Sequence, residues 1–187
     1  DEHIIQCIST LAQIERGELV EELPLSSSIL KAGLNRRVIY VALLLHDIGK
    51  GRPEDHSIIG AQIARRICPR LGLDAEECET VEWLVRYHLL MSDMAQKRDI
   101  GDPRTVRDFA KAVKTRKRLD LLTVLTVCDI RGVGPGTWNN WKAMLLRQLY
   151  RDTAAALEGG LESLNRAQRE DEAKRALRDV LSDWEQK

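Results

Sequence analysis

Apolar residues recur at intervals of three and four along almost the whole chain, whereas the strict alternation typical of β-strands is scarce. This period places the apolar side chains on one face of successive helices. The pattern therefore predicts an all-α fold. The expected helices cover residues 1–16, 29–48, 57–67, 74–88, 103–113, 116–131, 137–157 and 161–187.

Residue types that favour helix ends mark most of these boundaries. Asp74 followed by Glu77 is a capping-box pair, and Asp102 before Pro103 combines a cap with a proline suited to the first turn. Glycine-rich segments predict where helices stop. The remaining boundary residues are Ser26–Ser28 as caps of the second helix, Gly49 and Gly51 at its end, "GVGPG" at 132–136 as a break, Thr137 as a cap, and Gly159 with Gly160 as a stop.

We expect residues 1–158 to form one domain and residues 159–187 a charged connector helix. The connector carries Leu177, Val180, Leu181 and Trp184 at helical spacing, which indicates one face docked on the domain or on a neighbouring domain. The chain opens on Asp1 and not on methionine, so we expect it to be a fragment of a longer protein.

Composition narrows the classes of partner. Lys plus Arg number 29 and Asp plus Glu also 29, so no positive surplus favours nucleic acid or an anionic membrane. The longest apolar run, Val38–Leu45, is far shorter than the ~18 residues of a membrane span. Four cysteines lack zinc-knuckle spacing, and we expect them to be reduced in a cytoplasmic protein.

The four histidines are the first candidates for chemistry. His88 follows Val81, Leu84 and Val85 at helical spacing and should therefore point inward. Asp129 lies four residues beyond Leu125, at the edge of another apolar stripe. A buried carboxylate is costly unless a cation accompanies it.

His46 and Asp47 end a helix that is apolar nearly all round, while His56 begins the next helix and His3 the first. A single inward histidine is more often a hydrogen-bonded core residue than a ligand. Adjacent His and Asp cannot share one face of a regular helix, but they can converge where a helix end frays. Neutral imidazoles and carboxylates together are a ligand set for divalent ions, whose binding would offset the cost of burial.

The order His3, His46–Asp47, His56, His88, Asp129 resembles the HD superfamily of metal-dependent phosphohydrolases. Three longer segments carry a closer similarity, to the HD domain of the bacterial bifunctional uridylyltransferase/uridylyl-removing enzymes, over residues 1–158. They are "LLLHDIGKGRPEDHSIIGAQIA", "VEWLVRYHLLMSDMAQKRD" and "VLTVCDIRGVGPGTWNNWKAMLLRQLY". In that family the HD domain lies between a nucleotidyltransferase domain and paired ACT domains, which this chain lacks.

The resemblance implies a mononuclear metal set of His3, His46, Asp47 and Asp129. It implies that His56 and His88 would hold a second ion, with Asp47 bridging. The number of ions, one or two, remains open. Mn or Mg is the expected metal, and Fe or Zn is the alternative. The implied reaction is removal of UMP from a uridylylated tyrosine of the PII nitrogen-regulatory protein.

Two other functions remain open from the sequence. One is hydrolysis of a small free nucleotide by the same kind of centre. The other is a helical regulatory module whose metal has no catalytic role.

Basic and aromatic residues near these ligands have less specific interpretations. Lys50, three residues after Asp47, is a candidate catalytic residue that could reach a phosphate oxygen, although a solvated lysine is an equal alternative. Arg131 is a weaker candidate of the same kind. Arg52, Asp55 and Asp93 are interpreted as surface residues or as neighbours of the ligands, and Trp138 and Trp141 as packing residues rather than a base-stacking platform.

Overall fold

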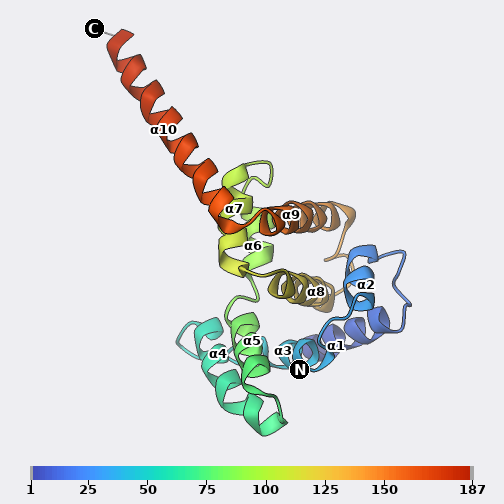
Figure 1. Ribbon diagram of the computed structural model, residues 1–187. Helices are drawn as coiled ribbons and strands as arrows, with labels where there is room; N and C mark the ends of the chain where they lie inside the picture. The colour runs from blue at the N-terminus through green and yellow to red at the C-terminus, as the bar shows by residue number, and fades with distance from the viewer. Residues whose placement is uncertain (1, 186–187) are drawn as a thin grey trace.

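The computed structural model describes residues 2–185, and these residues form helices and turns without a strand. This confirms the all-α prediction. Figure 1 shows the helices packed around α8, with the final helix projecting away from the others. The elements are α1 (Glu2–Glu15), α2 (Pro24–Lys31), α3 (Arg36–Leu45), α4 (His56–Ile67), a 3-10 turn η1 (Cys68–Leu71), α5 (Ala75–Arg86), α6 (Leu90–Lys97), α7 (Pro103–Val113), α8 (Arg116–Val133), α9 (Asn140–Glu158) and α10 (Leu161–Glu185).

Helix α8 is the centre of the core. It is buried over most of its length and packs against α1, α2, α3, α5, α6, α7 and α9. Its apolar residues Leu121, Leu122 and Leu125 are fully buried. Thr123 and Thr126 are buried among them because their hydroxyls donate to the carbonyls four residues earlier, at 2.7 Å each. Asp129 therefore sits near the end of a rigid, enclosed helix.

The predicted helix 29–48 was wrong, because two helices occupy this stretch. Gly33 has φ +109°, a conformation that L side chains rarely adopt, and it ends α2. Asn35 then caps α3 by accepting from the Val38 amide at 3.1 Å. Ser26–Ser28 lie inside α2 and are not its caps, since Pro24 begins that helix.

Other boundaries were confirmed or shifted by a few residues. The capping box of Asp74 and Glu77 is present with both hydrogen bonds, and Asp102 caps α7 before Pro103. Helix α9 begins at Asn140 with Asn139 as its cap, so Thr137 is not the cap. Helix α6 was missed, because its eight residues bury only Met91 and Ala95.

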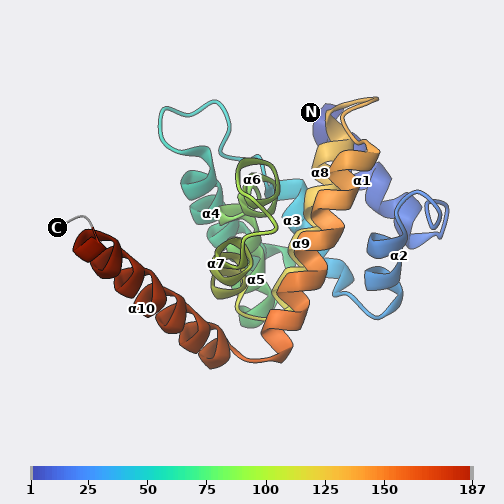
Figure 2. The same ribbon diagram turned by 90° about the horizontal axis from the view of Figure 1, so that it is seen from above.

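Helix α10 leaves the bundle after Gly160, as both ribbon views show (Figure 1 and Figure 2). Its first part contacts α7 and α9, and Lys111 donates to Gln168 at 3.1 Å. Leu177, Val180 and Leu181 are 61%, 66% and 48% exposed, so this face does not dock on the bundle. The side chain of Trp184, placed on the same face by its spacing, lies outside the described side chains.

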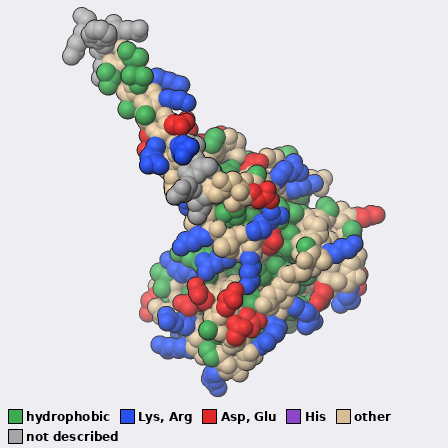
Figure 3. All heavy atoms as spheres, in the orientation of Figure 1, with side chains coloured by type: hydrophobic (Ala, Val, Ile, Leu, Met, Phe, Trp, Pro, Cys, Tyr) green, Lys and Arg blue, Asp and Glu red, His purple; other side chains and the backbone are tan. Residues whose placement is uncertain are grey.

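Charged side chains are mixed on the surface. Figure 3 shows basic and acidic groups interspersed over the face it presents, without a continuous basic patch there. Among residues 2–185, no helix is both long and apolar enough to cross a membrane.

The cysteines give a direct check of this core. Cys7, Cys68 and Cys128 are buried and Cys78 is half-buried, and all four thiols are free. Burial raises the pKa of Cys7 to about 12 and that of Cys68 to about 11, so little thiolate forms there at neutral pH. We expect an aromatic disulfide reagent at pH 7 to label Cys78 before the other three, as peptide mapping would show. Equal labelling of Cys7 and Cys78 in the native chain would contradict this packing.

Candidate metal centre

The turn after α3 carries the adjacent His46 and Asp47. Helix α3 ends at Leu45, and His46 is its C-cap. The chain then leaves the helical path, so consecutive side chains are not forced to opposite faces. Both point into the same site, with side-chain exposures of 0% for His46 and 6% for Asp47. The two side chains thus lie close together at this helix end, with His46 Nε2 3.4 Å from Asp47 Oδ2.

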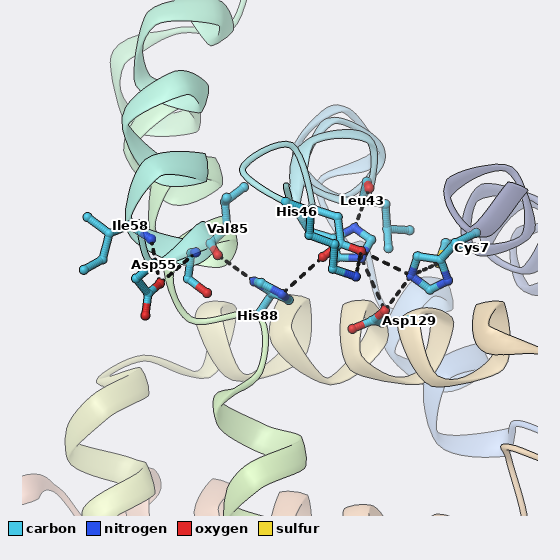
Figure 4. Close-up of polar contacts among 12 residues, drawn as sticks. Cys7, Leu43, His46, Asp55, Ile58, Val85, His88 and Asp129 are labelled. Carbon is cyan, nitrogen blue, oxygen red and sulfur yellow. Dashed lines mark hydrogen bonds and ion pairs between the residues drawn. The ribbon is translucent and has the colours of Figure 1, made fainter. Parts of the chain in front are cut away.

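Four further elements bring the remaining predicted residues to this turn. His3 comes from α1, His56 begins α4, His88 lies in the turn after α5, and Asp129 comes from α8. The rings of His3, His46, His88 and His56 form a row with successive centroid distances of 5.5, 5.3 and 5.4 Å. Figure 4 shows His88, His46 and Asp129 pointing toward one another. All six residues predicted as ligands are thus gathered in one place.

The two carboxylates lie between the imidazoles. The Nε2 atom of His3 lies 2.9 Å from Oδ1 of Asp129 and 3.6 Å from Oδ2 of Asp47. The Nε2 atom of His46 is 3.3 Å from Asp129 Oδ1 and 3.4 Å from Asp47 Oδ2. On the other side, His88 Nε2 lies 3.6 Å from Asp47 Oδ1. The two oxygens of Asp47 therefore face different histidines.

The backbone determines which ring nitrogen faces the carboxylates. His46 Nδ1 is 2.7 Å from the Leu43 carbonyl and His88 Nδ1 is 2.8 Å from the Val85 carbonyl. A carbonyl only accepts, so each Nδ1 carries the proton and each neutral ring has its lone pair on Nε2. Both Nε2 atoms then face carboxylate oxygens, which are also acceptors. Either a proton or a metal cation must lie between them.

Protonation differs along the row. Burial alone would lower the pKa of His46, but the hydrogen bond and charge of Asp129 outweigh it and raise this pKa. Burial opposes a low pKa for Asp129, yet the hydrogen bond with His46 and the neighbouring histidines lower it. The pKa of His88 falls, chiefly because burial disfavours its charged form. Of these two histidines, His88 is therefore more readily available as a neutral ligand than His46.

The donor atoms fall into two groups that fit divalent ions. One contains His3, Cys7, His46 and Asp129, and the other contains Asp47, His56 and His88, with the donor atoms of each group within 4.8 Å of one another. Adjacent donors bound at about 2.0–2.2 Å to one ion lie about 2.8–3.1 Å apart in octahedral geometry and about 3.3–3.6 Å apart in tetrahedral geometry. Most of the nitrogen–oxygen distances above fall in or near these ranges. The residues present fit such a centre.

Cys7 is the residue of this site that the sequence did not single out. Its Sγ lies 3.6 Å from His3 Nε2, one helical turn along α1. The sequence predicts only a reduced cysteine here, and the structure shows that Cys7 is fully buried. The i, i+4 spacing from His3 on the inward face of α1 was the available indication.

Asp55 positions His56. It accepts from the amides of Ser57 at 2.9 Å and Ile58 at 3.2 Å, and so caps α4 immediately before His56 (Figure 4). These amide hydrogen bonds lower the pKa of Asp55. Asp55 is thus an exposed neighbour of the ligands, as interpreted from the sequence, and it also has a structural role as the cap of α4.

The other candidates have defined partners. Lys50 donates to Asp47 Oδ2 at 2.6 Å, with 59% of its side chain exposed. Arg131 pairs with Glu22 at 2.9 Å. Trp138 is half-buried and packs against the core as expected, whereas Trp141 is 55% exposed, so its interpretation as a packing residue was wrong.

Comparison with known proteins identifies the family of this domain. Residues 1–130 match the HD domain family. The chain belongs to the HD domain family. HD domains are helical, metal-dependent phosphohydrolase domains that bind divalent ions, and the His and Asp groups above are the candidate ligands in this member.

Two relatives are highly similar over the whole chain. A bifunctional uridylyltransferase/uridylyl-removing enzyme of Cereibacter sphaeroides is 82% identical over 187 residues, which is all of this chain and 20% of that protein. An enzyme of the same name from Ruegeria pomeroyi is 78% identical over 184 residues, or 98% of this chain and again 20% of that protein. The HD domain chain thus spans about a fifth of these relatives.

Proposed function

We propose that this chain is a metal-dependent phosphodiesterase that removes UMP from a uridylylated tyrosine of the PII nitrogen-regulatory protein. The observation that carries the proposal is the position of the Asp47 carboxylate. One of its oxygens faces His3 and His46, and the other faces His88. Membership of the HD family supports the reaction type. The names of the relatives support removal of a uridylyl group, and the family resemblance supplies the tyrosine of PII as its carrier.

The proposed ligand set uses all six predicted residues. His3, His46 and Asp129 would hold one ion, His56 and His88 a second, and Asp47 would bridge them. Mixed imidazole and carboxylate donors suit Mn, Fe or Zn, while Mn or Mg is the ion expected from the family resemblance. A bound divalent ion would supply Lewis acidity and a nucleophilic water near neutral pH.

The chain's own residues would orient the ester and neutralise its charge. Hydrolysis forms a bond from a water oxygen to phosphorus and breaks the bond from phosphorus to the tyrosine oxygen, which takes up a proton. Tyrosine has a pKa of about 10, so its oxygen can leave phosphorus without a strong general acid. We assign Lys50 to a phosphate oxygen, because its mostly exposed ammonium group lies beside Asp47 and would lose that partner to a metal ion.

We also propose how the chain sits in a longer protein. Residues 1–158 would form the hydrolytic domain and residues 159–187 a connector. The connector's exposed Leu177, Val180 and Leu181 would contact a neighbouring nucleotidyltransferase or ACT domain. A cytoplasmic location follows from the proposed regulatory substrate, without nucleic acid or membrane as a partner.

Release of UMP tests the function. Uridylylated PII is incubated with the chain and Mn²⁺ or Mg²⁺, with the full-length protein as control, and UMP is measured by chromatography. Metal-dependent release by both proteins is the expected result. Faster turnover of free nucleotides would favour a nucleotide phosphohydrolase. Tight metal binding without hydrolysis of either substrate, in both proteins, would favour a regulatory module.

Replacement of His56 tests whether the centre holds two ions. We expect His56→Ala to lower the metal content by about one ion per chain, since this residue belongs only to the group with His88. Elemental mass spectrometry of the purified variant measures this. Unchanged stoichiometry with intact helicity would contradict a second ion at this position.

A further inference from the structure

A cavity lined by described residues opens at the His3 end of the metal centre. Its volume is about 840 Å³, within the ~300–1,000 Å³ typical of small-molecule sites. His3 lines this cavity, and its side chain, like that of Asp129, is 19% exposed. The buried His46 and His88 are enclosed farther along the row. Access to the centre from this side therefore passes through the cavity.

One wall of the cavity is a polar stripe on α1. His3, Gln6, Thr10 and Gln13 all line it, and they are spaced by three, four and three residues, which places them on one helix face. The stripe runs about 15 Å at ~1.5 Å per residue. It begins at a proposed metal ligand. A substrate with its phosphorus at the centre would extend along these amide and hydroxyl groups.

A second wall is formed by residues 131–136 and Trp138. Gly134 and Gly136 have φ +150° and +81°, and a Cβ built on either meets nothing within 4 Å. The glycine-rich segment thus turns the chain without filling the cavity. Trp138 adds a large apolar ring to this wall.

The charges in the cavity disfavour additional phosphates. Glu2 and Glu22 line it together with Arg131, which is already paired with Glu22 at 2.9 Å. The lining therefore carries no surplus positive charge. It suits a neutral group such as a nucleoside better than a di- or triphosphate chain.

We propose that this cavity is the nucleoside subsite and that it takes the uridine half of the phosphodiester. The inference rests on the proposed function of the metal centre. Uracil presents an N–H donor between two carbonyl acceptors, and the amides of Gln6 and Gln13 offer both donors and acceptors. The face of Trp138 can stack on a base, a contact that contributes about 1–3 kcal/mol in nucleic-acid binding proteins.

A second cavity is a natural control. It measures about 440 Å³ and lies beside Trp83 and Tyr87, with Gln62 in its lining. No proposed ligand lines it. It offers an aromatic ring and an amide, but no contact with the centre.

Binding of UMP in the presence of Mn²⁺ tests the subsite, measured by titration calorimetry on the 187-residue chain. We expect Gln6→Leu and Trp138→Leu each to weaken UMP binding about 10-fold, from a lost hydrogen bond or stacking contact. Inorganic phosphate binding and metal content should change less than about two-fold, since neither measurement involves a nucleoside or an aromatic ring. Gln62→Leu should leave UMP binding unchanged.

The outcomes separate this subsite from the proposed function. Unchanged UMP binding in folded Gln6→Leu and Trp138→Leu, or an equal loss of phosphate binding, overturns the subsite, as does absence of UMP binding by the parent chain. If Trp138→Leu unfolds by circular dichroism, Gln6→Leu decides, because Gln6 is exposed. Release of UMP from PII with normal binding by the variants leaves the function standing and removes the subsite. If the variants weaken UMP binding but the chain and the full-length protein release no UMP from PII, the subsite stands and the proposed function is overturned.

Discussion

Asp47→Ala is expected to abolish metal binding and to reduce UMP release by at least ~1,000-fold, while the chain remains helical. The carboxylate faces His3 and His46 through one oxygen and His88 through the other. Its removal takes a donor from the group with His56 and His88, and it also removes the oxygen that faces His3 and His46 in the other group. His46→Ala should have a similar effect, because its Nε2 lies beside both carboxylates.

The measurement pairs elemental analysis of the purified variants with the UMP-release assay. Asp93→Asn is the matched control: Asp93 is an exposed acid paired with Lys97, outside the cluster, and its loss should change neither quantity by more than about two-fold. Circular dichroism monitors the fold. Normal activity of Asp47→Ala or His46→Ala would remove the basis of the proposed centre.

Much of the candidate site could be predicted because ligand chemistry and helical period act locally. The inward direction of His88 followed from Val81, Leu84 and Val85 on one helix face, and all of these are buried. Whether the ligand residues meet depends on how the helices pack together. The apolar period of a single helix carries no information about this packing. The family resemblance supplied this juxtaposition, and the distances among His3, His46, Asp47 and Asp129 are consistent with it.

Cys7 and the cavity beside His3 were not foreseen for the same reason. An inward cysteine on α1 looks like any small core residue until α8 brings Asp129 beside it. The polar residues Gln6, Thr10 and Gln13 resemble a solvated face unless the second wall of the cavity is known. That wall comes from residues more than a hundred positions later in the chain.

The errors in the fold have local causes. Apolar periodicity continues across Gly33 and Asn35, so the two helices on either side appeared as one. The helix nevertheless breaks here, because Gly33 has a positive φ and Asn35 adopts the extended conformation of a helix cap. Helix α6 was missed because a short helix with two buried residues has little amphipathic pattern.

Gly49 was interpreted as a helix stop, but its small size has a different structural reason. It is buried, and a Cβ at this position would overlap the His56 carbonyl and lie 2.9 Å from the Gly60 amide nitrogen. Both neighbours are backbone atoms of α4, so they cannot rotate away. The turn that carries His46 and Asp47 can therefore approach α4, with His56 at its start, only with glycine here.

Gly49→Ala is accordingly expected to destabilise the chain by about 2–3 kcal/mol, near the upper end for overpacking. It should also lower metal content by displacing His56 from Asp47. Denaturant unfolding and elemental analysis measure the two effects. Gly60→Ala should cost less, since its Cβ would meet the movable side chain of Val85 at 3.1 Å, and Gly101→Ala should cost little, since its Cβ would meet only the exposed Asp99 side chain. Equal stability of the three variants would show that the turn does not depend on this close contact with α4.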